Sequence, residues 1–152
     1  MMNDLPQHLE IALVPNAALV TVVRASLRAA MPLWGASELV DTAELLTSEM
    51  VSNALQHGLA TEISVRATWD QSLLRVEVGE DDAAPLDAVP SATSLDATSG
   101  RGLFLIDKLA ERWGTASAPR GKTGWFELIA QPTPPVLADC SVAAHHAPVP
   151  CP

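Results

Sequence analysis

An apolar, helix-like stretch of the chain carries an acid and an amide on one line. In LLTSEMVSNALQHG, residues 45–58, Glu49, Asn53 and His57 recur every four residues, which is close to one helical turn. An Asn amide oxygen suits Mg²⁺, and a nearby carboxylate can hold a metal-bound water or accept a proton from a hydroxyl. The same spacing fits a Glu that reaches solvent and an Asn that makes a hydrogen bond in the core, so both interpretations stay open.

A glycine-containing turn, SGRG at residues 99–102, stands immediately before a second helix-like stretch. Gly100 and Gly102 would let the backbone approach a phosphate, and the free amides at the start of a helix favour anions. Arg101 could add charge-assisted contacts. The pattern also fits an ordinary turn at the start of a helix, and neither a P-loop nor a dinucleotide-binding glycine motif occurs in the chain.

Two further polar groups stand at the ends of strand-like stretches. Glu80 and Asp81 close the alternating segment VEVGED, and Thr123 opens the last one. Acids at the end of a strand can cap a turn, or they can accept hydrogen bonds from the exocyclic amine of a base. Thr123 could join such a contact, so these residues are candidates for the recognition of a base.

The elements that must position these residues follow from hydrophobic spacing. Period-two alternation predicts strands, and apolar positions three and four residues apart predict helices. The predicted strands cover 8–15, 61–70, 73–80 and 124–131, and the predicted helices cover 16–34, 41–58 and 103–114. A long connection over 81–102 is typical of a functional lid or a mobile loop. The order β-α-α-β-β-loop-α-β-β predicts an α+β fold, a two-layer sandwich with its helices on one face of a mixed sheet.

Several helix ends carry recognisable signals. Asn16 is a candidate cap for the first helix, and Asp41 with Glu44 has the spacing of a capping box at the second. Gly58 and Gly114 are expected to stop the second and third helices.

Composition limits the domain organisation and the classes of function. At 152 residues and 48% hydrophobic, the chain fits one globular domain over 1–131, followed by a Pro-rich tail over 132–152 that we expect to be disordered. The only cysteines, Cys140 and Cys151, lie in that tail, so no disulfide framework is expected. A net charge of −9 with nine Lys and Arg argues against binding to nucleic acid or an anionic membrane. Without an apolar run long enough to span a bilayer or a secretory signal, the predicted location is cytoplasmic.

The chain resembles the GHKL ATP-binding family in four features taken together. They are "SEMVSNALQHG", the acids at the strand end, "SGRGLFLIDKLAERWG" and the strand that begins at Lys-Thr. The resemblance covers residues 8–130 and is nearest to the anti-sigma-factor serine/threonine kinase branch. It implies the Bergerat fold, a histidine kinase-like ATPase domain, and binding of ATP with Mg²⁺. By position, Asn53 would hold the Mg²⁺ and Glu49 would be the general base.

The resemblance also assigns the rest of the nucleotide site. Residues that would touch the phosphates or the adenine are Gly100, Arg101, Gly102, Leu103, Glu80, Asp81 and Thr123. The chain departs from the family pattern around the base. Glu80 takes the place of the adenine-reading Asp, Asp82 and Ala84 take the places of glycines, and Phe104 stands where a further glycine often occurs.

The resemblance predicts a kinase that transfers the γ-phosphoryl of ATP to a Ser or Thr of a small antagonist protein. A sigma factor would be the competing partner, and helix 16–31 could pack across a homodimer. The alternative is a non-catalytic nucleotide-binding module that sequesters a sigma factor or a similar partner. A histidine-kinase catalytic domain is disfavoured because no helical segment with a phospho-acceptor His precedes it, and a metalloenzyme because His145 and His146 lie in the tail.

Overall fold

The computed structural model describes residues 6–57, 60–82, 100–118 and 121–131. In chain order the elements are β1 (Gln7–Leu13), α1 (Ala18–Leu33), the 3₁₀ turn η1 (Ser37–Leu39), α2 (Val40–His57), β2 (Ala60–Asp70), β3 (Leu73–Asp82), α3 (Gly100–Leu109), β4 (Arg112–Ala118) and β5 (Gly121–Ile129). The predicted order of strands and helices is therefore confirmed, although hydrophobic spacing located only four of the five strands and missed β4.

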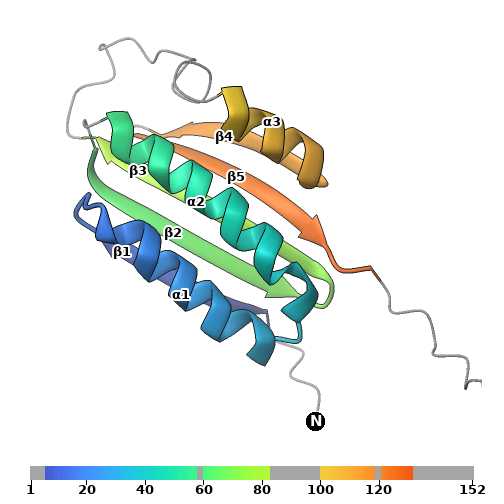
Figure 1. The fold of residues 1–152 in the computed structure, drawn as a ribbon. Helices are drawn as coiled ribbons and strands as arrows, with labels where there is room; N and C mark the ends of the chain where they lie inside the picture. Colours follow the sequence, from blue (N-terminus) through green and yellow to red (C-terminus); the bar gives the residue numbers. More distant parts are fainter. Residues whose placement is uncertain (1–5, 58–59, 83–99, 119–120, 132–152) are drawn as a thin grey trace, which may run out of the picture.

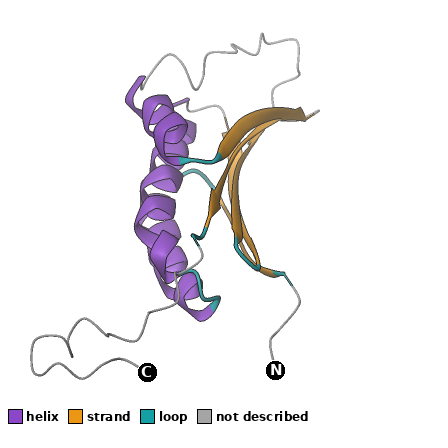
Figure 2. Cartoon of the chain, turned by 90° about the vertical axis from the view of Figure 1, so that its right-hand side faces the viewer, coloured by secondary structure: helices purple, strands orange, loops and turns teal. Residues whose placement is uncertain are grey.

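The elements form two layers, with the three α-helices of the described residues on one face of a five-stranded sheet (Figures 1 and 2). This confirms the predicted α+β sandwich. The expectation of a mixed sheet is wrong, because every strand pairing in the described part of the chain is antiparallel. The strand order β1-β2-β3-β5-β4 explains the difference. Strands β3 and β4 run in the same direction, but β5 lies between them and pairs antiparallel with both.

The hydrophobic core lies between the two layers. Helix α1 buries one stripe at four-residue spacing, as an amphipathic helix does, and each central strand buries alternate residues. The buried positions include Leu19, Val23, Leu27 and Met31 on α1, Leu46 and Val51 on α2, Ile63, Val65 and Ala67 on β2, Leu74, Val76 and Val78 on β3, Ile106 on α3, and Phe126 and Leu128 on β5.

The helix starts agree with the sequence only in part. The N-cap position of α1 is Ala17 rather than Asn16, but Asn16 lies next to it and its Oδ1 accepts a hydrogen bond from the Ala18 backbone N–H at 2.9 Å. The predicted capping box at Asp41 and Glu44 is wrong. Turn η1 leads directly into α2 at Val40, so Asp41 already lies within the first turn of α2. The Glu44 carboxylate is instead held by arginines of α1.

The predicted strands 61–70 and 73–80 are confirmed as β2 and β3, which pair as a hairpin. Asp70 pairs with Leu73 at its end, leaving Gln71 and Ser72 as the loop. Gln71 adopts a left-handed φ of 57°, and the Ser72 N–H donates to the Asp70 carbonyl at 2.6 Å. A non-glycine residue rarely adopts a positive φ, but this two-residue loop requires one.

The third helix is shorter than the prediction of 103–114. Helix α3 ends at Leu109, and residues 112–118 form strand β4. Gly114 is not a helix stop; it pairs with Trp125, and a Cβ at Gly114 would lie 2.9 Å from Cζ2 of that indole. The missing side chain therefore makes room for Trp125 across the two strands.

Two predictions fall mostly outside the described residues. Of the predicted loop over 81–102, only its first two residues, in β3, and its last three, in α3, are described. The predicted tail over 132–152, the stop at Gly58 and the position of Ala84 lie outside the described residues. The boundary of the domain at residue 131 stays a prediction.

Candidate functional site

Four segments that carry predicted site residues meet at one end of the fold. The C-terminal half of α2, the end of β3, the first turn of α3 and the start of β5 all lie there (Figure 1). The strand register agrees, because Asp81 near the end of β3 pairs with Gly121 at the start of β5. Segments up to seventy residues apart in sequence thus share one neighbourhood.

Asn53 is buried on the face of α2 that packs on the sheet. Its exposed fraction is 4%, and among the described residues its amide nitrogen Nδ2 has no hydrogen-bond partner. An unpaired polar atom in a protein interior costs about 1–3 kcal/mol, so it calls for a reason. The structure therefore does not support the interpretation in which the whole amide is satisfied by the core, and it leaves one end of the amide open to a ligand.

The side chain of Met50 on α2 reaches β5 beside Asn53. A Cβ at Gly124 would lie 2.6 Å from Cε of Met50, which is one turn before Asn53 on α2. Gly124 also pairs with Val78, so both positions face the helix layer. The absence of a side chain at 124 therefore leaves room for the end of the Met50 side chain.

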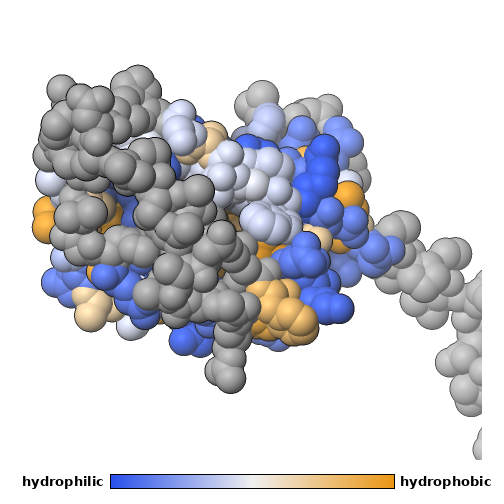
Figure 3. Space-filling view, turned by 90° about the horizontal axis from the view of Figure 1, so that it is seen from above, coloured by the Kyte–Doolittle hydropathy of each residue, from blue (hydrophilic) through white to orange (hydrophobic). Residues whose placement is uncertain are grey.

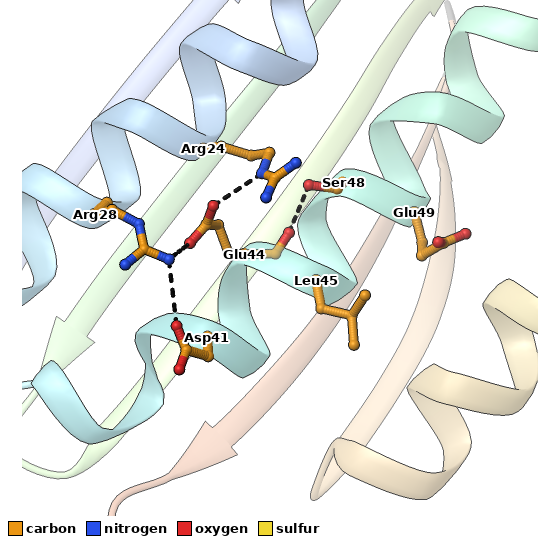
Figure 4. A pocket seen from close by; sticks show the side chains of 7 residues that line it. All are labelled: Arg24, Arg28, Asp41, Glu44, Leu45, Ser48 and Glu49. Carbon is orange, nitrogen blue, oxygen red and sulfur yellow. Dashed lines mark hydrogen bonds and ion pairs between the residues drawn. The ribbon is translucent and has the colours of Figure 1, made fainter.

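Glu49 lies at the rim of the same helix. The carboxylate is half-buried and points toward the side of α2 on which α3 lies (Figure 4). Among the described residues, no hydrogen bond or ion pair reaches it. The two residues of the four-residue repeat thus lie in different environments. The Asn53 amide is buried, whereas the Glu49 carboxylate is accessible and no described group orients it.

The two acids at the end of β3 point to opposite faces of the sheet. Val76 and Val78 face the helices, and the alternation of a strand places Glu80 on that face and Asp81 on the other. The Glu80 side chain is 13% exposed, and its Oε2 lies 3.5 Å from Nζ of Lys122 on β5. Asp81 is exposed, so only Glu80 joins Asn53 on the helix-facing side.

Thr123 lies on the face of the sheet that no described helix covers. A Cβ at Gly79 would lie 2.6 Å from Oγ of Ser64 and 3.6 Å from Oγ1 of Thr123, so these three positions form one row across the strands. Gly124, the next residue, faces the helices. The structure therefore does not bring Thr123 together with Asn53 and Glu80.

The first turn of α3 contains Gly100, Arg101, Gly102 and Leu103. The first amides of a helix have no partner within the helix, so their N–H groups can hold an anion. The side chains of 101–103 lie outside the described residues, whereas Phe104 is exposed and has Lys108 Nζ 5.5 Å from its ring centre. The backbone at this position suits phosphate.

Lys122 is the residue of this end that sequence reasoning passed over. The "GKTG" stretch drew attention to its threonine, but the lysine is the one that faces Glu80. The register between β3 and β5 was needed to see this pair.

A polar groove of about 300 Å³ runs along α1 and α2, and Glu49 lies at its edge (Figure 4). Arg24 Nε contacts Glu44 at 2.8 Å, Arg28 contacts the other oxygen of Glu44, and Arg28 also reaches Asp41 at 3.3 Å. The hydrogen bond from Arg24 holds the pKa of the Glu44 carboxyl below its ordinary value, against the opposing effect of burial. These groups satisfy one another, so we assign the cluster to helix packing rather than to a ligand.

In the view of Figure 3, the described residues that are visible show hydrophilic areas with smaller hydrophobic patches between them. Among the described residues, no cluster of three acidic, His or Cys side chains could hold a metal, and no helix is long and apolar enough to cross a bilayer. The candidate site is thus defined by its buried amide, one acid–lysine pair and the start of α3.

Comparison with known proteins places this geometry in a wider context. A family model described as the histidine kinase-like ATPase domain matches residues 13–126, a span that includes every predicted site residue. No curated protein sequence matches the chain. A solved structure of the RsbU and RsbW domains of Rv1364c from Mycobacterium tuberculosis is similar, with a TM-score of 0.59 and 21% identity. That similarity covers 80% of this chain but 31% of the solved chain, and at this identity it shows the fold alone.

Proposed function

Because the chain belongs to the histidine kinase-like ATPase domain family, we propose that it binds ATP with Mg²⁺ at the end of the fold described above. The observation that supports this site best is the buried Asn53, whose amide nitrogen has no partner. The unpaired Nδ2 would donate to a phosphate oxygen of the nucleotide, while the amide oxygen Oδ1 is an acceptable ligand for Mg²⁺, which takes few protein ligands. A nucleotide phosphate at this position would explain why a core helix retains an amide donor without a partner.

The other groups at this end have complementary tasks in the proposal. The N–H groups at the start of α3, from Gly100 to Leu103, would hold the phosphates. Glu80 would accept a hydrogen bond from the base, since it is the acid that faces the helix layer. The proposal gives Asp81 and Thr123 no contact with the nucleotide, because they lie on the other face of the sheet.

We further propose a protein kinase activity toward a Ser or Thr of a small antagonist protein. The hydroxyl oxygen of the partner would form a bond to the γ-phosphorus as the bond to ADP breaks, and Glu49 would take the hydroxyl proton. Bound Mg²⁺ would neutralise the phosphate charge. Glu49 suits this role because its carboxylate is accessible beside α3, while Asn53 on the same stripe is buried.

A non-catalytic module that sequesters a sigma factor or a similar partner is the second candidate. One observation favours it. A general base is commonly oriented by a further group, and no described residue bonds to the Glu49 carboxylate. The resemblance to the anti-sigma branch supports a sigma factor or an antagonist protein as the partner in both candidates.

Calorimetry with Mg²⁺ and ATP tests the nucleotide site. We expect binding by the wild-type chain and none by Asn53→Ala, with the exposed Glu38→Gln as the control that keeps binding. Absence of binding to the wild type would contradict the whole proposal.

Label transfer from γ-labelled ATP to a candidate antagonist protein separates the two functions. Glu49→Gln should slow transfer by about 10²- to 10⁴-fold, the usual contribution of a general base, while ATP affinity stays unchanged. Binding without any transfer by the wild-type chain would favour the sequestering module.

A further inference from the structure

Leu45 lies one helical turn before Glu49 on α2. Figure 4 shows both side chains on the flank of α2 toward which α3 lies. Leu45 is 41% exposed although it is apolar. A single exposed leucine is ordinary on a protein surface, so its meaning depends on what lies beside it.

Leu109 lies on the flank of α3 that faces α2. Ile106 is 2% exposed and faces the sheet. Asp107, the next residue, lies on the side of β4, because Trp113 Nε1 donates to Asp107 Oδ1 at 3.3 Å. Leu105 and Leu109 are four residues apart and lie on the flank opposite Asp107, since successive residues of a helix are rotated by about 100°. Helices α2 and α3 are in contact, so this flank of α3 faces α2.

The two exposed leucines lie at similar levels of the helix pair. Helix α3 begins at the end of the fold where α2 ends, so the two helices run in opposite directions (Figure 1). Leu109 comes nine residues after Gly100, which is about 14 Å along α3. Leu45 comes eight residues before Asn53, which is about 12 Å along α2. Leu109 is 43% exposed, so two accessible leucines lie on facing flanks about one turn from Glu49.

We propose that Leu45 and Leu109 dock an apolar side chain of the acceptor protein beside the Ser or Thr that is phosphorylated. The inference rests on the proposed kinase activity and adds a requirement on the sequence of its substrate. An acceptor hydroxyl has to come within hydrogen-bond distance of the Glu49 carboxylate, so the acceptor protein covers the surface around it. Covering the two leucines removes apolar surface from water, which favours binding.

The spacing along α2 defines where the docked side chain lies in the acceptor protein. Leu45 and Glu49 are one turn apart, or about 6 Å. In an extended acceptor segment, residues two positions apart face the same side and lie about 7 Å from each other. In a helix, residues four positions apart are about 6 Å apart on one face. The apolar residue is therefore expected two positions from the acceptor in a strand, or four in a helix.

Label transfer from γ-labelled ATP, measured at increasing concentrations of the antagonist protein, tests this inference. Leu45→Asn and Leu109→Asn nearly keep the side-chain shape and remove its apolar character. Each should raise KM for the antagonist protein by about 10- to 100-fold. The value of kcat and the affinity for ATP should stay unchanged, because a docking contact is made equally in the ground state and the transition state.

A matched control and a milder variant make the result specific. Leu33→Asn changes a leucine that is 84% exposed at the end of α1, on the other side of α2 from α3, and should leave KM unchanged (Figure 1). Leu45→Ala should raise KM in the same direction but less. Urea unfolding and calorimetry with ATP confirm that each variant is folded and binds nucleotide.

Substitutions in the antagonist protein identify the docked side chain. Each apolar residue within four positions of the phosphorylated Ser or Thr is changed to Ala in turn. One of these changes should raise KM with the wild-type chain and have little further effect with Leu45→Asn, because that contact is already lost. Strict additivity, or an unchanged KM in folded Leu45→Asn and Leu109→Asn, would overturn this inference alone. Absence of transfer by the wild type would overturn the proposed kinase activity as well.

Discussion

Replacing Asn53 with Leu should stabilise the nucleotide-free protein while it abolishes nucleotide binding. The side chain is 4% exposed and Nδ2 is unpaired, so the folded chain bears the cost of a buried donor without a partner. That cost is about 1–3 kcal/mol, and an apolar side chain removes it. Fitting the differently shaped Leu side chain into the core lowers the free energy of unfolding by up to about 1.5 kcal/mol. The expected net change is an increase of about 1 kcal/mol in the free energy of unfolding.

The assay is urea unfolding of the nucleotide-free chain, followed by calorimetry with Mg²⁺ and ADP. In a domain of this size, 1 kcal/mol corresponds to about 2–4 °C in the melting temperature, so thermal unfolding gives an independent measurement. Leu46→Ala on the same helix is the matched control. Leu46 is fully buried, and its truncation should lower the free energy of unfolding by about 2–5 kcal/mol.

A loss of stability in Asn53→Leu with nucleotide binding unchanged would refute the assignment of Asn53 to a ligand. If Asn53 were a structural residue with its amide satisfied by the core, Asn53→Leu would lower stability by about 1–3 kcal/mol. A loss of that size, with nucleotide binding unchanged, would show that the residue serves the core and not a ligand.

Three further predictions concern the packing around the site and the helix pair. Gly124→Ala should lower the free energy of unfolding by no more than about 1 kcal/mol, because the new methyl would lie 2.6 Å from Met50 Cε, the end of a flexible side chain that moves aside. Adding Met50→Ala should cost less than the sum of the single variants, and strict additivity in urea unfolding would argue against the contact. Gly121→Ala should cost about 3 kcal/mol or more, because its Cβ would lie 1.8 Å from a backbone carbonyl oxygen of β3, and wild-type stability would disprove that approach. Glu44→Gln should make unfolding less sensitive to acid. The hydrogen bond from Arg24 lowers the pKa of folded Glu44, so its carboxylate stabilises the fold above an unfolded pKa of about 4.3 and loses that contribution as the pH falls through the folded value. Equal slopes of stability between pH 7 and 3 in both chains would contradict this.

Local spacing was enough to predict much of the fold. The alternation of β2 and β3, the two-residue loop between them and the buried stripe of α1 all follow from neighbours in sequence. The end of α3 did not follow. Residues 112–114 continue a plausible helical pattern, and only their pairing with β5 makes them a strand.

The capping box failed for a similar reason. Asp41 and Glu44 have the right spacing, but Arg24 and Arg28 lie across the helix pair and take the Glu44 carboxylate. Spacing within one helix carries no information about the charges that a neighbouring helix will present.

In the candidate site, too, local spacing determined some features and tertiary contacts decided the others. The sequence by itself determined that Glu49 and Asn53 share one stripe of a helix, because a helical turn has a constant length. It also determined that Glu80 shares the face of Val76 and Val78, because the three are alternate residues of one strand. Both statements depend only on local geometry.

Only the tertiary structure decided which face of β5 meets the helices. Trp125 and Phe126 are both large and apolar, so the alternation of β5 allows either set of residues to be buried. Phe126 is fully buried, while Trp125 lies on the other face, under Arg75 at 4.2 Å and over the space left by Gly114. That choice directs Lys122 toward Glu80 and Thr123 away from it, because successive side chains of a strand point to opposite faces.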